Sequence, residues 1–141
     1  MKMLRFYICL ILMATASPVA TTAATSAARS NSTAPTIALD FSICLGRASA
    51  ALEYAHLIGH PPAREMVRWQ SFNDLYQAVA PDTSKTTSKD IARQLLSQRI
   101  RAKMALSRLL TLGRFNDDPR LSAKARADAT LQLRQCDELI S

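Results

Sequence analysis

Two cysteines, Cys44 and Cys136, have the most definite chemistry of any residues in this chain, and they lie near the two ends of its helix-patterned segment. In an oxidising compartment, two cysteines placed in this way are expected to form one disulfide. A pair of free buried thiols is the alternative. Redox catalysis is disfavoured because the sequence has no Cys-x-x-Cys pair. We therefore expect a single bridge from Cys44 to Cys136.

A second group, formed by Glu53, His56 and His60, has the spacing that would bring three side chains towards one metal ion on a continuous helix. However, the sequence Gly59-His-Pro-Pro62 breaks the helix at His60, and no His-Glu-x-x-His arrangement accompanies it. Two surface histidines near a helix C-terminus, where positive charge is favoured, are the alternative. We expect no metal and no cofactor, and these three residues are the nearest approach to a metal site.

Sequence motifs for catalysis are lacking. The chain has neither a Gly-x-Ser-x-Gly elbow nor a glycine loop that would cradle phosphate. Asp117 and Asp118 form a carboxylate pair, but Pro119 directly after them favours a helix-capping role. The single tryptophan, Trp69, is expected in the core. We predict a protein that is not an enzyme, with a small enzyme whose groups converge from distant positions as a third hypothesis.

Three arginines, Arg93, Arg101 and Arg108, form a strip on the third predicted helix. The planar fork of arginine suits paired hydrogen bonds with carboxylates, so this strip is a candidate surface for binding an acidic protein. The alternative is a solvated face whose arginines pair within the chain, with Asp90 or Glu65.

The N-terminal residues 1–24 have the organisation of a secretory signal peptide: a charged start, an apolar run over 6–13 and small residues after it. The apolar run is much shorter than the roughly twenty residues that a membrane-spanning helix needs. Cleavage is expected near Ala23 or Ala24, with 14–16 as the alternative region. We therefore predict a periplasmic or secreted product without a transmembrane anchor.

The basic charge of the chain limits the partners to consider. The formal net charge is +7, and it falls to +5 if Lys2 and Arg5 leave with the signal peptide. An exported protein meets little nucleic acid, and aromatic residues make up only 6% of the chain, too few for base-stacking platforms. An acidic protein or an anionic envelope surface fits an exported basic protein better.

Apolar residues recur at helical spacing from Leu39 onwards, and no strand-like alternation of useful length interrupts them. Short connections between the predicted helices favour antiparallel neighbours. The fold class is therefore all-α: a small antiparallel bundle of about four helices closed by one disulfide. The expected parts are a signal peptide at 1–24, a disordered lead-in at 25–37 and one domain at 38–141. Within this domain, the first helix is expected over 39–58 and the second over 62–80. A polar loop at 82–88 precedes the third helix, which runs to 113, and the fourth helix starts at 118.

The third predicted helix carries apolar residues on two faces. Two apolar faces predict burial on two sides, so we expect neighbouring helices to cover both. One face holds Ile91, Leu95, Ala102, Leu106 and Leu109; the other holds Leu96, Ile100 and Met104.

The sequence thus predicts an exported helical protein that binds an acidic protein, as an inhibitor, an immunity-type protein or an adaptor would. A module for anionic envelope polymers or lipid head groups is the second hypothesis. Polymer binding favours a continuous cluster of lysine and arginine. This chain spaces its arginines among Glu, Asp and Gln, which favours a specific protein partner.

Overall fold

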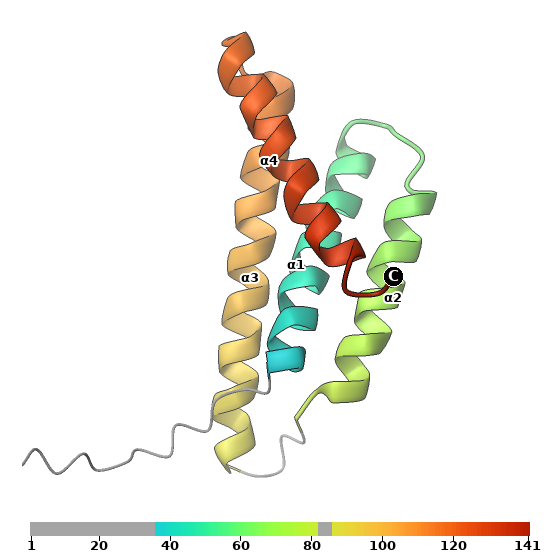
Figure 1. Ribbon diagram of the computed structural model, residues 1–141, viewed down its shortest axis with the longest axis vertical. Coiled ribbons are helices and arrows are strands. Elements are labelled where there is room, and N and C mark those ends of the chain that lie inside the picture. Colours follow the sequence, from blue (N-terminus) through green and yellow to red (C-terminus); the bar gives the residue numbers. More distant parts are fainter. Residues whose placement is uncertain (1–35, 82–85) are drawn as a thin grey trace, which may run out of the picture. The chain divides into compact units, whose positions relative to one another are not determined.

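The computed structural model describes residues 36–81 and 86–141, and this part of the chain is all-helical without a strand. The predicted class and the number of helices are confirmed. The signal peptide, the lead-in up to residue 35 and most of the polar loop lie outside the described residues. Consecutive helices run antiparallel (Figure 1): α1 (Thr36–Leu57), α2 (Ala63–Val79), α3 (Thr86–Phe115) and α4 (Pro119–Asp137).

The helix ends follow from local chemistry. After α1, Gly59 adopts a positive φ of 68°, a left-handed conformation that glycine takes without steric cost. Before α4, Asp118 Oδ1 accepts hydrogen bonds from the backbone N–H groups of Arg120 and Leu121 at 2.8 and 3.2 Å. Pro119 occupies the first helical position, where its missing N–H costs nothing. Asp118 therefore caps α4, as its position before a proline predicts.

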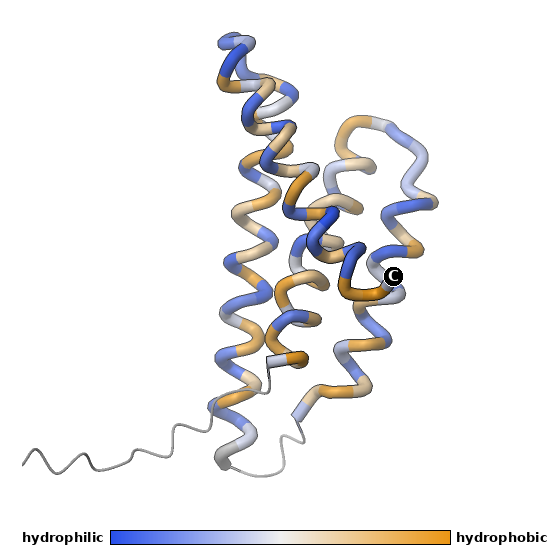
Figure 2. The backbone as a smooth tube through the Cα atoms, viewed as in Figure 1, coloured by the Kyte–Doolittle hydropathy of each residue, from blue (hydrophilic) through white to orange (hydrophobic). Residues whose placement is uncertain are grey.

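The central element is α1, which packs against each of the other three helices. Strongly hydrophilic residues are few along it, whereas they recur along α3 (Figure 2). Buried positions in α1 occur around the helix: Ala38, Phe41, Ser42, Cys44, Leu45, Gly46, Ala48, Ala50, Ala51 and Ala55. In contrast, the only buried residue of α2 is Phe72.

A row of small residues on α1 lets α3 approach closely. A Cβ atom on Gly46 would overlap the carbonyl oxygen of Arg99, so only glycine fits at this crossing. Beside it, the Ser42 hydroxyl donates a buried hydrogen bond to the Leu95 carbonyl at 2.6 Å. The row repeats every four residues and is buried throughout: Ala38, Ser42, Gly46 and Ala50.

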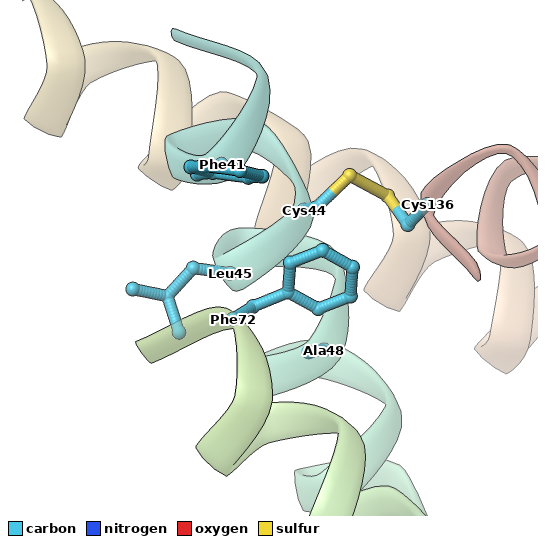
Figure 3. Close-up of a cluster of buried hydrophobic side chains, with 6 residues drawn as sticks. All are labelled: Phe41, Cys44, Leu45, Ala48, Phe72 and Cys136. Carbon is cyan, nitrogen blue, oxygen red and sulfur yellow. A yellow bond between two sulfur atoms is a disulfide. The ribbon is translucent and has the colours of Figure 1, made fainter. Parts of the chain in front are cut away.

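The predicted disulfide is confirmed and lies in the largest core cluster. Cys44 of α1 and Cys136 of α4 are bonded, with their Cα atoms 5.5 Å apart. Figure 3 shows Phe72 of α2 beside this bond and beside α1, where Leu45 and Ala48 complete the cluster with Phe41. The bridge thus joins the first and last helices inside the core.

The C-terminal helix is held by contacts to two other helices. At its start, the Gly113 carbonyl of α3 accepts hydrogen bonds from Ser122 Oγ and Arg126 Nη1, both at 2.7 Å. At its end, Asp137 accepts a two-pronged hydrogen bond from the Arg68 guanidinium of α2, at 2.8 and 2.7 Å. With the disulfide, these contacts fix α4 at both ends.

The prediction that both apolar faces of α3 are buried is wrong. Leu95 and Leu106 on the first face are fully buried, but Leu96, Ile100 and Met104 on the second face are exposed. The reason is that α2 packs against α1 and makes no close backbone contact with α3 within the described residues. α1 packs against all three other helices, whereas α3 packs against α1 and α4 and its second apolar face is left uncovered.

Candidate functional site

Three large apolar side chains form an exposed row along the outward face of α3, which we call the α3 stripe: Leu96, Ile100 and Met104. Their exposed fractions are 53%, 52% and 64%. Single exposed apolar residues are ordinary on a protein surface, but a continuous row is characteristic of a surface that binds something. Successive members are four residues apart and therefore about one helical turn apart.

Positive charge borders the α3 stripe on both sides. A residue in an α-helix is rotated by about 100° from the preceding one, which places Arg101 and Arg108 on one side of the stripe and Arg99 and Lys103 on the other. Acidic residues do not occur in the sequence from Ile91 to Phe115. Six cations lie in that segment: Arg93, Arg99, Arg101, Lys103, Arg108 and Arg114.

The structure places the predicted strip of Arg93, Arg101 and Arg108 beside the α3 stripe, and all three side chains are exposed. Arg93 donates a hydrogen bond to Asp90 at 3.1 Å, so the alternative of an internal ion pair applies to this arginine. Both partners are largely exposed, and such pairs contribute little to stability. Arg101 and Arg108 form no salt bridge within residues 36–81 and 88–141.

A groove of about 350 Å³ runs alongside the α3 stripe. Leu96 and Ile100 form one wall, Trp69 of α2 forms the other, and Ser49 and Leu52 of α1 line it between them. This arrangement exists because α2 and α3 both pack on α1 and, within the described residues, make no close backbone contact with each other. Trp69 packs against the core and also lines the groove, so its role is wider than the core position expected from the sequence.

An ion pair borders this groove. Lys103 Nζ of α3 donates to Glu53 Oε1 of α1 at 2.6 Å, and Arg99 also lines the groove. The Lys103 and Glu53 side chains are 36% and 59% exposed, so water screens their attraction. The groove therefore combines an apolar wall with two cations and one paired acid.

The structure does not bring Glu53, His56 and His60 together as a metal site. Glu53 is engaged with Lys103, α1 ends at Leu57, and His60 follows the left-handed turn at Gly59. Within the described residues, no group of three His, Cys, Asp or Glu side chains is arranged to hold a metal ion.

A second groove, between α2 and α4, differs from the first in its charge. Its volume is about 370 Å³, and it is lined by Arg64, Arg68 and Arg134 together with Glu65 and Asp137. Both positive and negative groups line this groove, and the Arg68 guanidinium already donates to both carboxylate oxygens of Asp137. This surface has no single complementary charge to offer a partner.

Two arginines that the sequence gives no reason to single out have internal roles. The Arg68 side chain is only 9% exposed because it is clamped against Asp137. Arg47 of α1 donates to the Gln132 carbonyl of α4 at 3.1 Å, and burial lowers the pKa of its guanidinium. Their partners lie far away in sequence, so no local spacing reveals them.

Comparison of the chain with protein-family models, with curated proteins and with solved structures finds no match. Among the helices described, none combines the length and the apolar character needed to cross a bilayer.

Proposed function

We propose that this protein is an exported, non-enzymatic interaction protein that binds an acidic protein through the outward face of α3. The observation that carries this proposal is the α3 stripe with cations on both sides and no acid from Ile91 to Phe115. An apolar centre with a charged rim is the usual anatomy of a protein interface. Inhibitors, immunity-type proteins and adaptors all act through such surfaces.

The two parts of this face contribute differently to binding. Removing exposed apolar side chains from water is favourable by roughly 25 cal/mol per Å² of apolar surface, and part of this free energy offsets the entropy lost on association. The surrounding arginines attract an acidic partner from a distance and donate paired hydrogen bonds to carboxylates on contact. The disulfide between α1 and α4 is in keeping with the export that the N-terminal sequence predicts.

Binding to anionic lipid head groups or envelope polymers is the second candidate. It is favoured by the six cations along α3, because the segment from Ile91 to Phe115 contains no acidic residue, whereas the chain as a whole contains both acids and bases. The concave groove beside the α3 stripe favours a protein, because a flat lipid surface does not fill it.

Site-specific photo-crosslinking tests the proposal. A photoreactive phenylalanine analogue at Met104 should capture one partner in the exporting cell, and the same analogue at Lys124 on α4 is the control position. The captured protein is then purified, and its affinity is measured by titration calorimetry against the intact protein. Equal capture at both positions, or no capture at Met104, would contradict the proposal.

Arginine variants then separate the two candidates. Replacing Arg93, Arg101 and Arg108 by Lys keeps the charge but removes the fork, so a protein partner should bind several-fold more weakly. Replacing them by Gln should weaken binding at least tenfold, about 1.4 kcal/mol, and reduce its salt dependence. Gln at the exposed Arg64, Arg120 and Arg134 is the control for net charge. Equal binding of the Lys variant and the unmodified protein to anionic vesicles would instead favour the second candidate.

A further inference from the structure

We infer that the groove between α2 and α3 receives one amphipathic helix of the acidic partner, with an apolar residue between Trp69 and Ile100 and carboxylates facing Arg99 and Lys103. This inference rests on the proposed function and specifies the element of the partner that binds. The occupant is a helix of a protein, rather than a lipid surface or a second copy of this chain.

The shape of the groove selects a helix. Two helices, α2 and α3, lie on either side of α1 and leave part of it uncovered at Ser49 and Leu52. Packed helices lie about 8–10 Å apart. A further helix laid along this opening would have α1, α2 and α3 as neighbours, because residues of all three line the groove. Recognition of this kind uses apolar anchors on one face of the incoming helix, spaced three or four residues apart.

The length of the α3 stripe sets the length of the occupant. Leu96 and Met104 are eight residues apart in α3, which corresponds to about 12 Å along a helix axis at 1.5 Å per residue. A partner helix aligned with the α3 stripe therefore needs about three turns to contact all of its members. An apolar face of two to four residues on that helix matches the row of Leu96, Ile100 and Met104.

The charge around the groove selects an acidic helix. Arg99 lines the groove, and Lys103 is held there by Glu53 in a pair that is substantially exposed to water. Such a pair costs little to open, so a carboxylate of the partner can take over Lys103 or share it. Arg101 and Arg108 border the opposite side of the α3 stripe. A basic helix would face these cations without compensation.

The chain carries its own reporter for this groove, because Trp69 is its only tryptophan and forms one wall. A helix seated against Trp69 excludes water from the indole and should shift its emission to shorter wavelength. A library of 14-residue helical peptides, displayed on phage and selected against the intact protein, supplies the probes. The inference predicts that the selected peptides have apolar residues at three- and four-residue spacing, flanked by Asp and Glu. These peptides should shift the Trp69 emission.

Two variants locate the binding of a selected peptide. Ile100→Asp should weaken it at least tenfold, because a carboxylate then stands in the apolar wall and faces the acids of the peptide. Leu131→Asp on α4 is the matched control, since Leu131 is also an exposed apolar residue, and it should bind the peptide as the unmodified protein does. The Trp69 emission of the unmodified protein provides an independent readout that needs no variant.

Four results would overturn the inference. The selected peptides could be neutral or basic, they could leave the Trp69 emission unchanged, or the selection could yield no peptide. The fourth result is that Ile100→Asp binds a selected peptide as tightly as the unmodified protein does. A shift of Trp69 emission by phosphatidylglycerol vesicles, with no peptide selected, would assign the groove to a lipid surface. A dimer in sedimentation that buries Trp69 would assign it to a second copy. In both cases the inference fails.

Failure of the inference about the groove can be distinguished from failure of the proposed function. The binding of the partner captured at Met104 can depend on Arg101 and Arg108 and still leave the Trp69 emission unchanged. In that case the proposed function stands and the groove is not the site. If neither the arginine variants nor Ile100→Asp alters binding of that partner, both proposals fail.

Discussion

The two apolar faces of α3 have the same helical spacing but opposite environments. Leu95 on the inward face is fully buried, whereas its neighbour Leu96 on the outward face is 53% exposed. The inward face is covered because the small residues around Gly46 let α1 approach the α3 backbone closely. Helical spacing thus identifies apolar rows, but the surface of the neighbouring helix decides which row is buried.

The two faces also differ in their polar surroundings. On the inward side, the buried Ser42 and Ser122 hydroxyls donate hydrogen bonds to the Leu95 and Gly113 carbonyls of α3. On the outward side, Arg101 and Arg108 form no salt bridge within the described ranges. The inward face therefore contributes buried contacts that stabilise the fold, whereas the arginines beside the outward face can pair with acidic groups of a partner.

The largest expected effect comes from placing one carboxylate on each face. Leu95→Asp introduces an unpaired charge at a site without solvent access, and it should cost about 4 kcal/mol or more, enough to abolish cooperative unfolding in a small domain. Leu96→Asp should cost less than about 1 kcal/mol because its carboxylate reaches water. Urea denaturation followed by circular dichroism measures both. Similar losses in the two variants would break the comparison.

Reduction of the disulfide should have the next largest effect, because the bridge holds α1 and α4 together while both pack on α3. Cys44 and Cys136 are separated by 92 positions. On the chain-entropy argument, closing a loop of this size stabilises the fold by about 4 to 5 kcal/mol. We expect a clearly lower melting temperature in reductant, measured by calorimetry. The Cys44→Ser, Cys136→Ser double variant should no longer respond to reductant, and an unchanged melting temperature of the unmodified protein would contradict this account.

Much of the inward half of the molecule follows from sequence patterns. The four helices, the cap at Asp118 and the pairing of Cys44 with Cys136 depend on local spacing or on the chemistry of cysteine. The small residues at Ala38, Ser42, Gly46 and Ala50 also indicate a close helix crossing, but this signal is recognisable only when small side chains are tracked as well as large ones.

The groove could not be predicted in the same way. The pairing of Glu53 with Lys103 and the position of Trp69 opposite Ile100 depend on how whole helices pack, which local spacing does not specify. Likewise, nothing in the row of Leu96, Ile100 and Met104 distinguishes a buried face from an exposed one. The sequence pattern places Arg101 and Arg108 between the two apolar rows of α3, but it does not show that the row of Leu96, Ile100 and Met104 is exposed.

A smaller effect is expected at the ion pair that ties α2 to α4. Asp137→Asn leaves the largely buried Arg68 guanidinium without its counter-charge, which should cost about 1 to 3 kcal/mol. The matched control is Asp128→Asn, because Asp128 pairs with Lys124 on the exposed surface, and this change should cost less than about 0.5 kcal/mol. Chemical denaturation of both variants distinguishes a charge used for folding from one at the solvated surface. Equal costs would remove this distinction.

The central claim is that the outward face of α3 is not part of the core, and a small change in stability tests it most directly. The free energy of unfolding of Ile100→Asp, measured in urea beside the unmodified protein and Leu95→Asp, should lie within about 1 kcal/mol of the unmodified value, as is usual for an exposed position. The circular dichroism spectrum should also be unchanged. If Ile100→Asp instead unfolds the protein as severely as Leu95→Asp, the outward face is a buried structural surface and the account is wrong.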